Sequence, residues 1–401
     1  MTRRVVITGL GPVSSIGIGT VEFGAALRTG RTGISPITSF DASGFPHFMA
    51  GEVQGFEPTK FVQVLDPSQW GRTSLFAASA ARLAVEHAGM DPDRLAASAA
   101  GSSIGTTSGE SQVIEHLTEQ SLAAGFTGLD PALVRQVPAS RLAHAVNREL
   151  GLTGEATTIS TACAASNYAL GYAYDLISSG ELDYMLAGGA DSVIRWAHAG
   201  FYRLGALTAE ACAPFSQGRS GILTGEGGAV LFLESLDSAV DRGAEILAEI
   251  LGYGLNCDAN HMVAPDSASI AECMRLAHRN AGITAADVDY ICAHGTGTPA
   301  NDSAEARAVV EVFEQPPPIS SIKSMLGHTM GAASGFGAIA SVLGMTQGFI
   351  PPTMNFTAAD PDLPPIDPVA NRARTAMLRI VQNNGFAFGG NNAIVIFGRA
   401  A

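Results

Sequence analysis

Short β-branched runs alternate along the whole chain with small-residue or amphipathic stretches of helical length. Apolar runs of four or five residues bounded by turn residues are typical of buried strands. The expected strands are Arg4–Thr8, Ala156–Ser160, Tyr184–Ala187, Ala229–Glu234, Ala248–Leu251, Tyr290–Ala293, Ile319–Ile322 and Ile394–Phe397. The expected helices include Ser74–Ala88, Ala165–Ser178, Ser267–Ala281, Ser303–Phe313 and Gly331–Met345. This alternation predicts α/β layers with mostly parallel sheets.

A faint internal symmetry divides the pattern near residue 245. The opening segment VVITGLGPVSS has a loose counterpart in LAEILGYGLNCDAN, near residue 247. Each half then closes with a glycine-bounded apolar strand, YMLAGGADSVI in the first and NNAIVIFG in the second. We therefore expect a duplicated fold with one half at 1–245 and the other at 246–401.

Composition indicates a globular protein with a large core. Apolar residues make up 46% of the 401 residues and charged residues 15%, which excludes a disordered chain. The 23 basic and 37 acidic residues give a net charge of −14, which argues against unspecific binding to nucleic acid or to an anionic membrane. No apolar run reaches the roughly 18 residues that span a membrane, and no signal-peptide pattern precedes the first strand.

The cysteine pattern predicts reduced thiols in a cytoplasmic protein. Five cysteines without a close C-x-x-C pair favour neither a disulfide framework nor a zinc site. They are Cys163, Cys212, Cys257, Cys273 and Cys292. All but Cys163 lack a setting for chemistry and are expected to be core or incidental residues.

Cys163 is the first candidate for chemistry. In TTISTACAASNYAL a strand ends, small residues turn the chain, and a helix begins directly after the cysteine. The positive end of the helix dipole stabilises a thiolate there and lowers the thiol pKa. The backbone N–H of the turn is available to an oxyanion. A small buried cysteine without a catalytic role is the alternative.

His294 ends the apolar run VDYICA and precedes the turn GTGTPAND. This places the imidazole at the carboxyl end of a strand, where ligands of open α/β sheets bind. A turn histidine bonded to backbone is the alternative. Thr296 and Thr298 offer hydroxyls to a polar ligand, whereas Asp302 and Glu305 are expected to cap and orient the next helix.

Two further segments place reactive or aromatic residues among glycines. IKSMLGHTMGAASG brings Lys323 and His328 into one strand–turn–helix segment, although a solvated loop charge is the alternative for the lysine. QNNGFAFGGNNA holds Phe386 and Phe388, which form either a gate or a packed hairpin.

Two glycine-rich segments are weaker signals. GLGPVSS is an incomplete dinucleotide fingerprint because Ser14 replaces its third glycine, and GILTGEGG lacks the lysine of a phosphate-binding loop. Zinc binding by Cys163, His294 and His328 is disfavoured by their wide separation in sequence.

In order, these segments resemble the elongating β-ketoacyl-acyl carrier protein synthases of the thiolase superfamily. The resemblance covers nearly the whole chain through RRVVITGLGPVSSIG, TACAAS, PFSQGRSGILTGEGGAVLFLE, HGTGTPAND, KSMLGHTMGAA and NNGFAFGGNNA. It implies a duplicated five-layer α-β-α-β-α thiolase fold, a dimer, and decarboxylative Claisen condensation of a malonyl carrier thioester with a cysteine-bound acyl chain. No metal or other cofactor is implied, because the phosphopantetheine of the carrier protein holds the substrates.

The resemblance assigns roles by motif position. Cys163 is the nucleophile, His294 and His328 are the catalytic histidines, and Lys323 is the nearby lysine. The oxyanion hole is formed by the N–H groups of Cys163 and Phe388. The positions that contact pantetheine or the acyl chain are Thr296, Thr298, Ile104, Phe386 and Phe388.

Several positions depart from the family pattern. Gly337 stands where a glutamate is usual, which leaves Lys323 without its acidic partner, and Ala387 replaces a glycine. The basic run that meets the carrier protein is missing, so docking is predicted to use Arg72, Arg195 and Arg203. Arg135 and Gln136 replace apolar residues near the dimer interface and hint at an altered tunnel or an unlike partner.

The alternatives differ in class and pathway. A degradative thiolase would need a second catalytic cysteine, and none follows Cys292. Initiating synthases use an asparagine in place of His328. A non-catalytic subunit of the chain-length-factor type would lack the nucleophile, although this chain could pair with one as a heterodimer instead of forming a homodimer. Among active synthases, a type II polyketide or polyene system is favoured over housekeeping fatty-acid elongation.

Overall fold

The computed structural model describes residues 3–400, and its largest element is an 11-stranded mixed sheet. The strands of the first half are β1 (Val5–Ser14), β2 (Gly17–Ile18), β5 (Gly101–Gly105), β6 (Ala156–Ile159), β7 (Tyr184–Asp191) and β9 (Gly227–Ser235). Those of the second half are β10 (Ala248–Cys257), β11 (Tyr290–Cys292), β12 (Ile319–Ser320), β15 (Ile380–Phe386) and β16 (Asn391–Gly398). Small sheets are formed by β3 (Ser35–Pro36), β4 (Met49–Gly51) and β8 (Thr224–Gly225), and by β13 (Phe349–Ile350) and β14 (Arg374–Thr375).

The strand order repeats about the middle of the sheet. It runs β12-β11-β15-β16-β10-β1-β9-β7-β5-β6, so that β1-β9-β7-β5-β6 matches β10-β16-β15-β11-β12. Within each set the first two pairings are antiparallel and the last two are parallel. In each half, four of the five strands therefore run in one direction, which confirms the expectation of mostly parallel sheets, and β9 or β16 alone runs against its two neighbours. The boundary between residues 245 and 246 stays a prediction.

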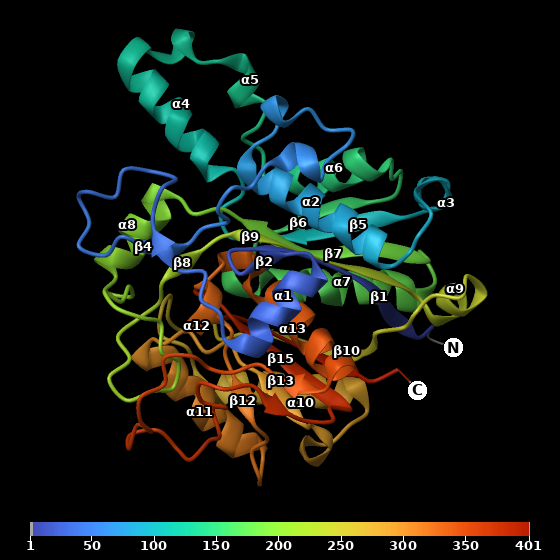
Figure 1. The fold of residues 1–401 in the computed structure, drawn as a ribbon, viewed down its shortest axis with the longest axis vertical. Coiled ribbons are helices and arrows are strands. Elements are labelled where there is room, and N and C mark those ends of the chain that lie inside the picture. Colours follow the sequence, from blue (N-terminus) through green and yellow to red (C-terminus); the bar gives the residue numbers. More distant parts are fainter. Residues whose placement is uncertain (1–2, 401) are drawn as a thin grey trace.

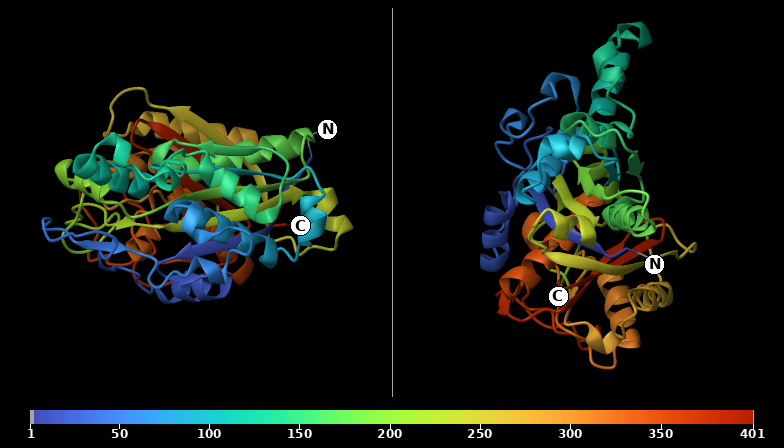
Figure 2. Two further views of the ribbon diagram at one scale, coloured as in Figure 1. Left: turned by 90° about the horizontal axis from the view of Figure 1, so that it is seen from above. Right: turned by 90° about the vertical axis from the view of Figure 1, so that its right-hand side faces the viewer.

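Helices and strands alternate in five layers, with a layer of helices in the middle and one on each outer face (Figures 1 and 2). The outer layer of the first half contains α2 (Arg72–His87) and α6 (Arg141–Leu150), and that of the second half contains α10 (Ser267–Ala281) and α11 (Pro299–Val312). Between the sheets lie α7 (Ala165–Ser179) and α13 (Ala333–Gln347), which contact strands of both halves. Three hydrophobic clusters fill the space between the layers: one surrounds the central helices, and one lies under the outer helices of each half. This is the duplicated α-β-α-β-α thiolase fold expected from the sequence.

The remaining helices are short or peripheral. They are α1 (Thr20–Thr29), α3 (Pro92–Ala96), α4 (Ser111–Ala124), α5 (Pro131–Val134), α8 (Arg195–Arg203), α9 (Leu236–Asp241) and α12 (Lys323–Leu326). The α4–α5 segment projects from the body as an arm (Figure 1). No helix within residues 3–400 has both the length and the apolar composition needed to cross a membrane.

The two halves join through a short antiparallel pairing of β1 with β10, between Val5–Ile7 and Ala248–Ile250. Beyond it, a register shift follows Ile7 in β1 and another follows Ile250 in β10. Such bulges bend a strand and increase its twist. The sheets can therefore diverge and leave space for the central helices.

Matching tight turns precede the two central helices. A 3-10 turn over Ala162–Ala164 leads into α7, and another over Met330–Ala332 leads into α13. Ala162 and Met330 both adopt positive φ angles, 48° and 51°. Residues with a Cβ are strained in this conformation, and such strain is concentrated at functional sites. The first turn carries Cys163, and the second begins two residues after His328.

Candidate active site

Cys163 is the middle residue of the first of these turns, between the carboxyl end of β6 and the start of α7. Its side chain is buried, with 6% of the residue exposed. Burial raises the pKa of the thiol to about 11, although the positive charge of Lys323 and the backbone N–H groups of Phe388 and Cys163 act to lower it. The expectation of a lowered thiol pKa is therefore wrong for the free enzyme. Desolvation outweighs the helix terminus, so the resting group is a thiol.

His294 follows β11 and is held by a carboxylate that also lies in the core. Glu305 accepts the backbone N–H of His294 at 2.8 Å and that of Gly295 at 2.7 Å. Asp302 accepts the N–H groups of Phe215, Thr296 and Gly297. These acids do not cap the helix as expected, because the Thr298 hydroxyl is the cap of α11. Instead they shape the loop that carries the imidazole.

His328 follows α12, and hydrogen bonds hold both its backbone and its ring in place. Its N–H donates to the carbonyl of Leu223 at 2.6 Å, and its Nδ1 accepts the N–H of Met330 at 3.0 Å. Because Nδ1 is an acceptor, the proton of the neutral ring resides on Nε2. His328 therefore presents a hydrogen-bond donor.

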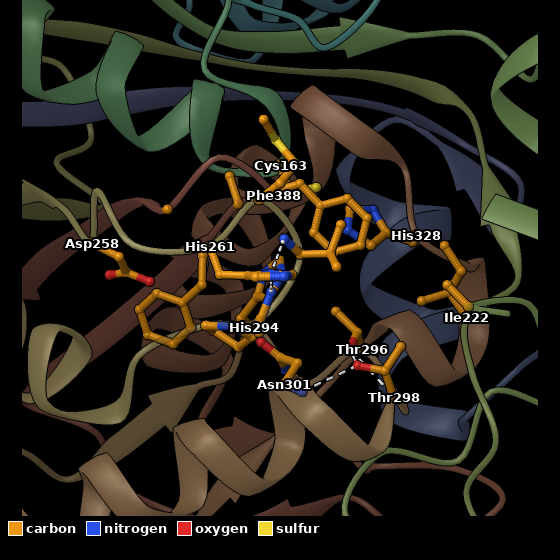
Figure 3. Close-up of a pocket in the computed structure, with 18 of the residues that line it drawn as sticks. Cys163, Ile222, Asp258, His261, His294, Thr296, Thr298, Asn301, His328 and Phe388 are labelled. Atoms are coloured by element: carbon orange, nitrogen blue, oxygen red, sulfur yellow. Dashed lines mark hydrogen bonds between the residues drawn. The ribbon is translucent and has the colours of Figure 1, made fainter. Parts of the chain in front are cut away.

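The two imidazoles meet edge to face and share one cavity with the cysteine (Figure 3). Their ring centroids are 5.5 Å apart, with an angle of 82° between the planes. Burial lowers the pKa of His294 and of His328 well below the usual value, and the charge of Lys323 lowers both further. Both rings are therefore neutral near pH 7.

Lys323 begins α12 and is buried beside these groups, so it is not a solvated loop residue. Its Nζ donates to the backbone carbonyl of His294 at 2.5 Å. Burial lowers the lysine pKa, whereas the acidic groups around it, Glu305 among them, act to raise it. The lysine is thus oriented by a carbonyl, without a carboxylate in direct contact.

The aromatic pair lies at the tip of the β15–β16 hairpin. Phe386 is buried and its ring lies 5.7 Å from that of His294. Phe388 is half-buried, and its ring lies 5.9 Å from that of Phe201 on α8. Both rings line the cavity, with Phe386 packed against His294 and Phe388 against Phe201.

The cavity, about 560 Å³ when its opening to solvent is included, is lined by residues from both halves. Thr296 and Thr298 line it as expected, with their hydroxyls 2.9 Å apart. Asn301 lies beside them, and Asp258 and His261 come from the loop after β10. Sequence reasoning missed these three residues. The sequence held one signal for Asp258 and His261. They follow β10, the strand that corresponds to β1, and ligands bind at the carboxyl ends of strands in open α/β sheets.

Not every predicted site residue reaches this cavity. Ile104 is fully buried in the outer core of the first half and is not among the lining residues. Arg72 forms an ion pair with the buried carboxylate of Glu226 at 2.5 Å, while 31% of its side chain remains exposed. Arg195 and Arg203 are exposed on α8, the helix that also supplies Phe201.

The departures from the family pattern have clear positions. A Cβ at Gly337 would lie 2.4 Å from the carboxamide oxygen of Asn383, so a larger residue there requires the Asn383 side chain to move. Ala387 donates its N–H to Asn391 across the hairpin, at 2.9 Å. At the base of the arm, Arg135 is exposed and Gln136 is buried.

A thiol at a strained turn, two neutral imidazoles and a hairpin N–H around one cavity define a thiolase-fold ketosynthase site. Family models agree over most of the chain: the β-ketoacyl synthase N-terminal domain matches residues 2–239 and the C-terminal domain matches residues 247–357. The chain belongs to the β-ketoacyl synthase family and is a carbon–carbon bond-forming acyltransferase.

Curated relatives and solved structures match over full length. The chloroplastic 3-oxoacyl-[acyl-carrier-protein] synthase I of Hordeum vulgare is 35% identical, over 98% of this chain and 89% of its own. Nodulation protein E of Rhizobium meliloti is 36% identical over 99% of each chain. The ishigamide ketosynthase/chain length factor superposes with a TM-score of 0.98 and 51% identity over 100% of both chains. A type II polyketide ketosynthase bound to its acyl-carrier protein gives a TM-score of 0.92 and 29% identity, also over 100% of both.

Proposed function

We propose that this chain condenses malonyl-acyl carrier protein with an acyl chain held on Cys163, as the active subunit of a type II polyketide or polyene system. The observation that carries the reaction is the convergence of Cys163, the two neutral imidazoles and the N–H of Phe388 on one cavity. No metal or redox cofactor is needed for the steps below.

In the first step the Cys163 sulfur attacks the thioester of an acyl carrier. The acyl group moves to Cys163, and the thiol proton leaves with the departing carrier thiol. The oxyanion of the tetrahedral intermediate accepts the N–H groups of Cys163 and Phe388, the two backbone groups that act to lower the thiol pKa in the free enzyme.

In the second step a malonyl carrier enters and loses carbon dioxide. The electron pair of the broken carbon–carbon bond forms an enolate, and negative charge develops on the thioester oxygen. The Nε2–H of His328 donates to this oxygen, and neutral His294 supplies the second donor without protonating the carbon. The nucleophilic carbon then attacks the Cys163 thioester and releases a β-ketoacyl carrier and the free cysteine.

The pathway assignment rests on the degree of likeness. This chain shares 51% identity with the ishigamide ketosynthase/chain length factor, against 35% with the synthases of Hordeum vulgare and Synechocystis that are named 3-oxoacyl-[acyl-carrier-protein] synthases. Housekeeping fatty-acid elongation is the second candidate. A non-catalytic subunit is disfavoured by the presence of Cys163.

The decisive experiment incubates the protein, alone and with a co-expressed chain-length-factor subunit, with malonyl carrier and a panel of acyl carriers. Intact-protein mass spectrometry is expected to show an acyl adduct on the wild type and none on Cys163→Ala. Preference for polyunsaturated or β-keto chains supports the polyketide assignment. Preference for saturated chains by the protein alone would favour fatty-acid elongation.

The proposed partner subunit has a candidate surface on the arm. Leu122 on α4 and Phe126 just after it are 83% and 85% exposed. The two side chains lie four residues apart at the end of one helix, and exposed apolar side chains that form one patch mark interaction sites. Leu122→Asp with Phe126→Asp is expected to abolish co-purification with the partner subunit, and a homodimer that elongates alone would overturn the heterodimer.

Carrier docking is proposed to use Arg195 and Arg203. Both are exposed on α8, and Phe201 of that helix lines the cavity, so a carrier bound here lies next to the entrance. Arg195 already contacts Glu119 at 3.3 Å, which leaves Arg203 as the principal contact. Arg203→Glu is expected to raise the KM for the carrier substrate with little change in kcat. An unchanged KM would exclude this surface.

A further inference from the structure

Two asparagines form a polar clip in the core beneath the active site. Asn383 lies on β15 and Asn167 lies on α7, and both are buried. The Asn383 carboxamide donates to the side-chain oxygen of Asn167 at 2.9 Å. The Asn167 carboxamide donates in return to the backbone carbonyl of Asn383 at 3.1 Å and to that of Ala393 on β16 at 3.0 Å.

The clip also includes the second central helix. Ser334 lies in the first turn of α13, three residues after Gly331. Its backbone carbonyl accepts the Asn383 carboxamide at 2.8 Å, and its hydroxyl accepts the backbone N–H of Asn167 at 3.1 Å. Each carboxamide nitrogen therefore donates two hydrogen bonds, and each bond is accepted by a group on another helix or strand.

Each element tied by the clip carries part of the catalytic site. The helix α7 follows Cys163, α13 follows the turn after His328, and the β15–β16 hairpin carries Phe388. A separate bond from the Ser166 hydroxyl to the carbonyl of Gly331, at 2.5 Å, joins α7 to the turn before α13 but does not reach the hairpin. The asparagines add the hairpin to this contact.

Gly337 forms the fourth side of the clip. The Asn383 oxygen is buried without a hydrogen-bond partner among the described residues, and a Cβ at Gly337 would collide with it. The glycine thus provides the space that lets Asn383 lie across the two helices. None of Asn167, Asn383, Ser334 and Gly337 lines the cavity.

We propose that Asn167 and Asn383 are positioning residues that hold the acyl-bearing cysteine in line with the histidines, so that each decarboxylation ends in a carbon–carbon bond. This deepens the proposed function and rests on it. Acyl transfer needs only the cysteine and the hairpin N–H, and decarboxylation needs only the imidazoles. Condensation needs both groups in one geometry, and small misplacements of reacting groups are costly.

Loss of alignment has a specific chemical signature. When the enolate does not reach the Cys163 thioester, its carbon takes a proton from solvent and leaves as acetyl carrier. Carbon dioxide is then released without a new carbon–carbon bond. The ratio of carbon dioxide to β-ketoacyl product is about one in a coupled enzyme and rises when coupling fails. A smaller amount of folded enzyme changes both quantities equally and leaves the ratio unchanged.

The test measures this ratio in the wild type, Asn383→Ala, Gly337→Ala and the double variant, each in the assembly that is active in the wild type. Each single variant is expected to keep Cys163 acylation and to raise the ratio several-fold. The double variant is expected to resemble Asn383→Ala alone, because the added Cβ then enters vacated space. Asn383→Ser, whose hydroxyl is too short to bridge both helices, is the milder substitute if Asn383→Ala does not fold.

Asn147→Ala is the matched control, because Asn147 is a buried asparagine bonded to Ser102 and Gly154 in the outer layer. It is expected to lower the Tm but to leave the ratio at the wild-type value. A ratio unchanged in Asn383→Ala and Gly337→Ala, or raised equally by Asn147→Ala, would overturn the proposal. An inactive wild type would instead overturn the proposed function.

Discussion

The Nζ of Lys323 donates to the backbone carbonyl of His294 across the floor of the active site, at 2.5 Å. One charge on a buried amine therefore acts on three reactive groups. It lowers the pKa of both imidazoles, which keeps them neutral donors, and it also lowers the pKa of the Cys163 thiol. Because burial raises that thiol pKa more strongly, Cys163 and both imidazoles are uncharged in the free enzyme near pH 7.

The first prediction concerns the reactivity of Cys163 in the free enzyme. With a pKa of about 11, the thiolate fraction is expected to rise about tenfold per pH unit through the range 7.5 to 9.5. Iodoacetamide alkylation of Cys163, followed by mass spectrometry in a Cys257→Ala background, measures this rate. Lys323→Met is expected to slow alkylation further at each pH, and a rate that levels off below pH 8 would contradict the raised pKa.

The second prediction separates the two half-reactions. His328→Ala removes the Nε2–H donor, so malonyl decarboxylation is expected to fall about 100- to 1000-fold. Acylation of Cys163 should persist, because it uses the N–H groups of Cys163 and Phe388. Radiolabelled carbon dioxide release and adduct mass measure the two steps. The exposed His116 provides the control, and equal loss of both steps would argue against this division.

The third prediction is a loss of stability in acid. The folded state holds His294 and His328 with lowered pKa values, whereas the unfolded chain binds protons near the ordinary value of 6.5. The unfolded state therefore binds more protons below that pH, and each site costs up to about 1.4 kcal/mol of stability per pH unit. Urea unfolding at pH 7.5 and 5.5 measures the loss. In the variant His294→Asn/His328→Asn, the unfolding free energy should differ less between the two pH values. A difference equal to that of the wild type would contradict the lowered histidine pKa values.

The fourth prediction concerns Arg72, which the structure places in an ion pair. Arg72→Ala leaves the fully buried carboxylate of Glu226 without its cation, and such losses cost about 3 kcal/mol of unfolding free energy. Chemical denaturation is the measurement. Arg203→Ala serves as the control, because Arg203 is exposed and its substitution is expected to leave the unfolding free energy unchanged. A stable Arg72→Ala with a raised carrier KM would restore Arg72 to the docking surface.

Much of the fold and the reactive trio could be predicted from local patterns. Short apolar strands, the small-residue turn before α7 and the glycine turns after β11 and α12 placed Cys163, His294 and His328 at strand ends, and the structure brings all three into one cavity. The duplicated strand order was visible as a faint repeat. These features depend on neighbouring residues, which a sequence displays directly.

Features that depend on distant partners were not predictable. The direction of β9 and β16 is set by their neighbours in the sheet, so local patterns could not show that the sheets are mixed. Desolvation of Cys163 is a property of the surrounding core, and the helix terminus alone gave the opposite sign. The carboxylates of Asp302 and Glu305 bind a loop that precedes their helix, where a local interpretation saw only caps.

The paired turns before α7 and α13 are built alike, yet their middle residues are Cys163 and Gly331. A Cβ at Gly331 would collide with the backbone of Thr106, so that turn has no room for a thiol of its own. In the proposed mechanism, the first turn therefore carries the acyl chain on Cys163, and the second turn follows the histidine that stabilises the enolate. Under the proposed function, each polypeptide then elongates a single growing chain at a time, and a cysteine at residue 331 would require the backbone of Thr106 to move.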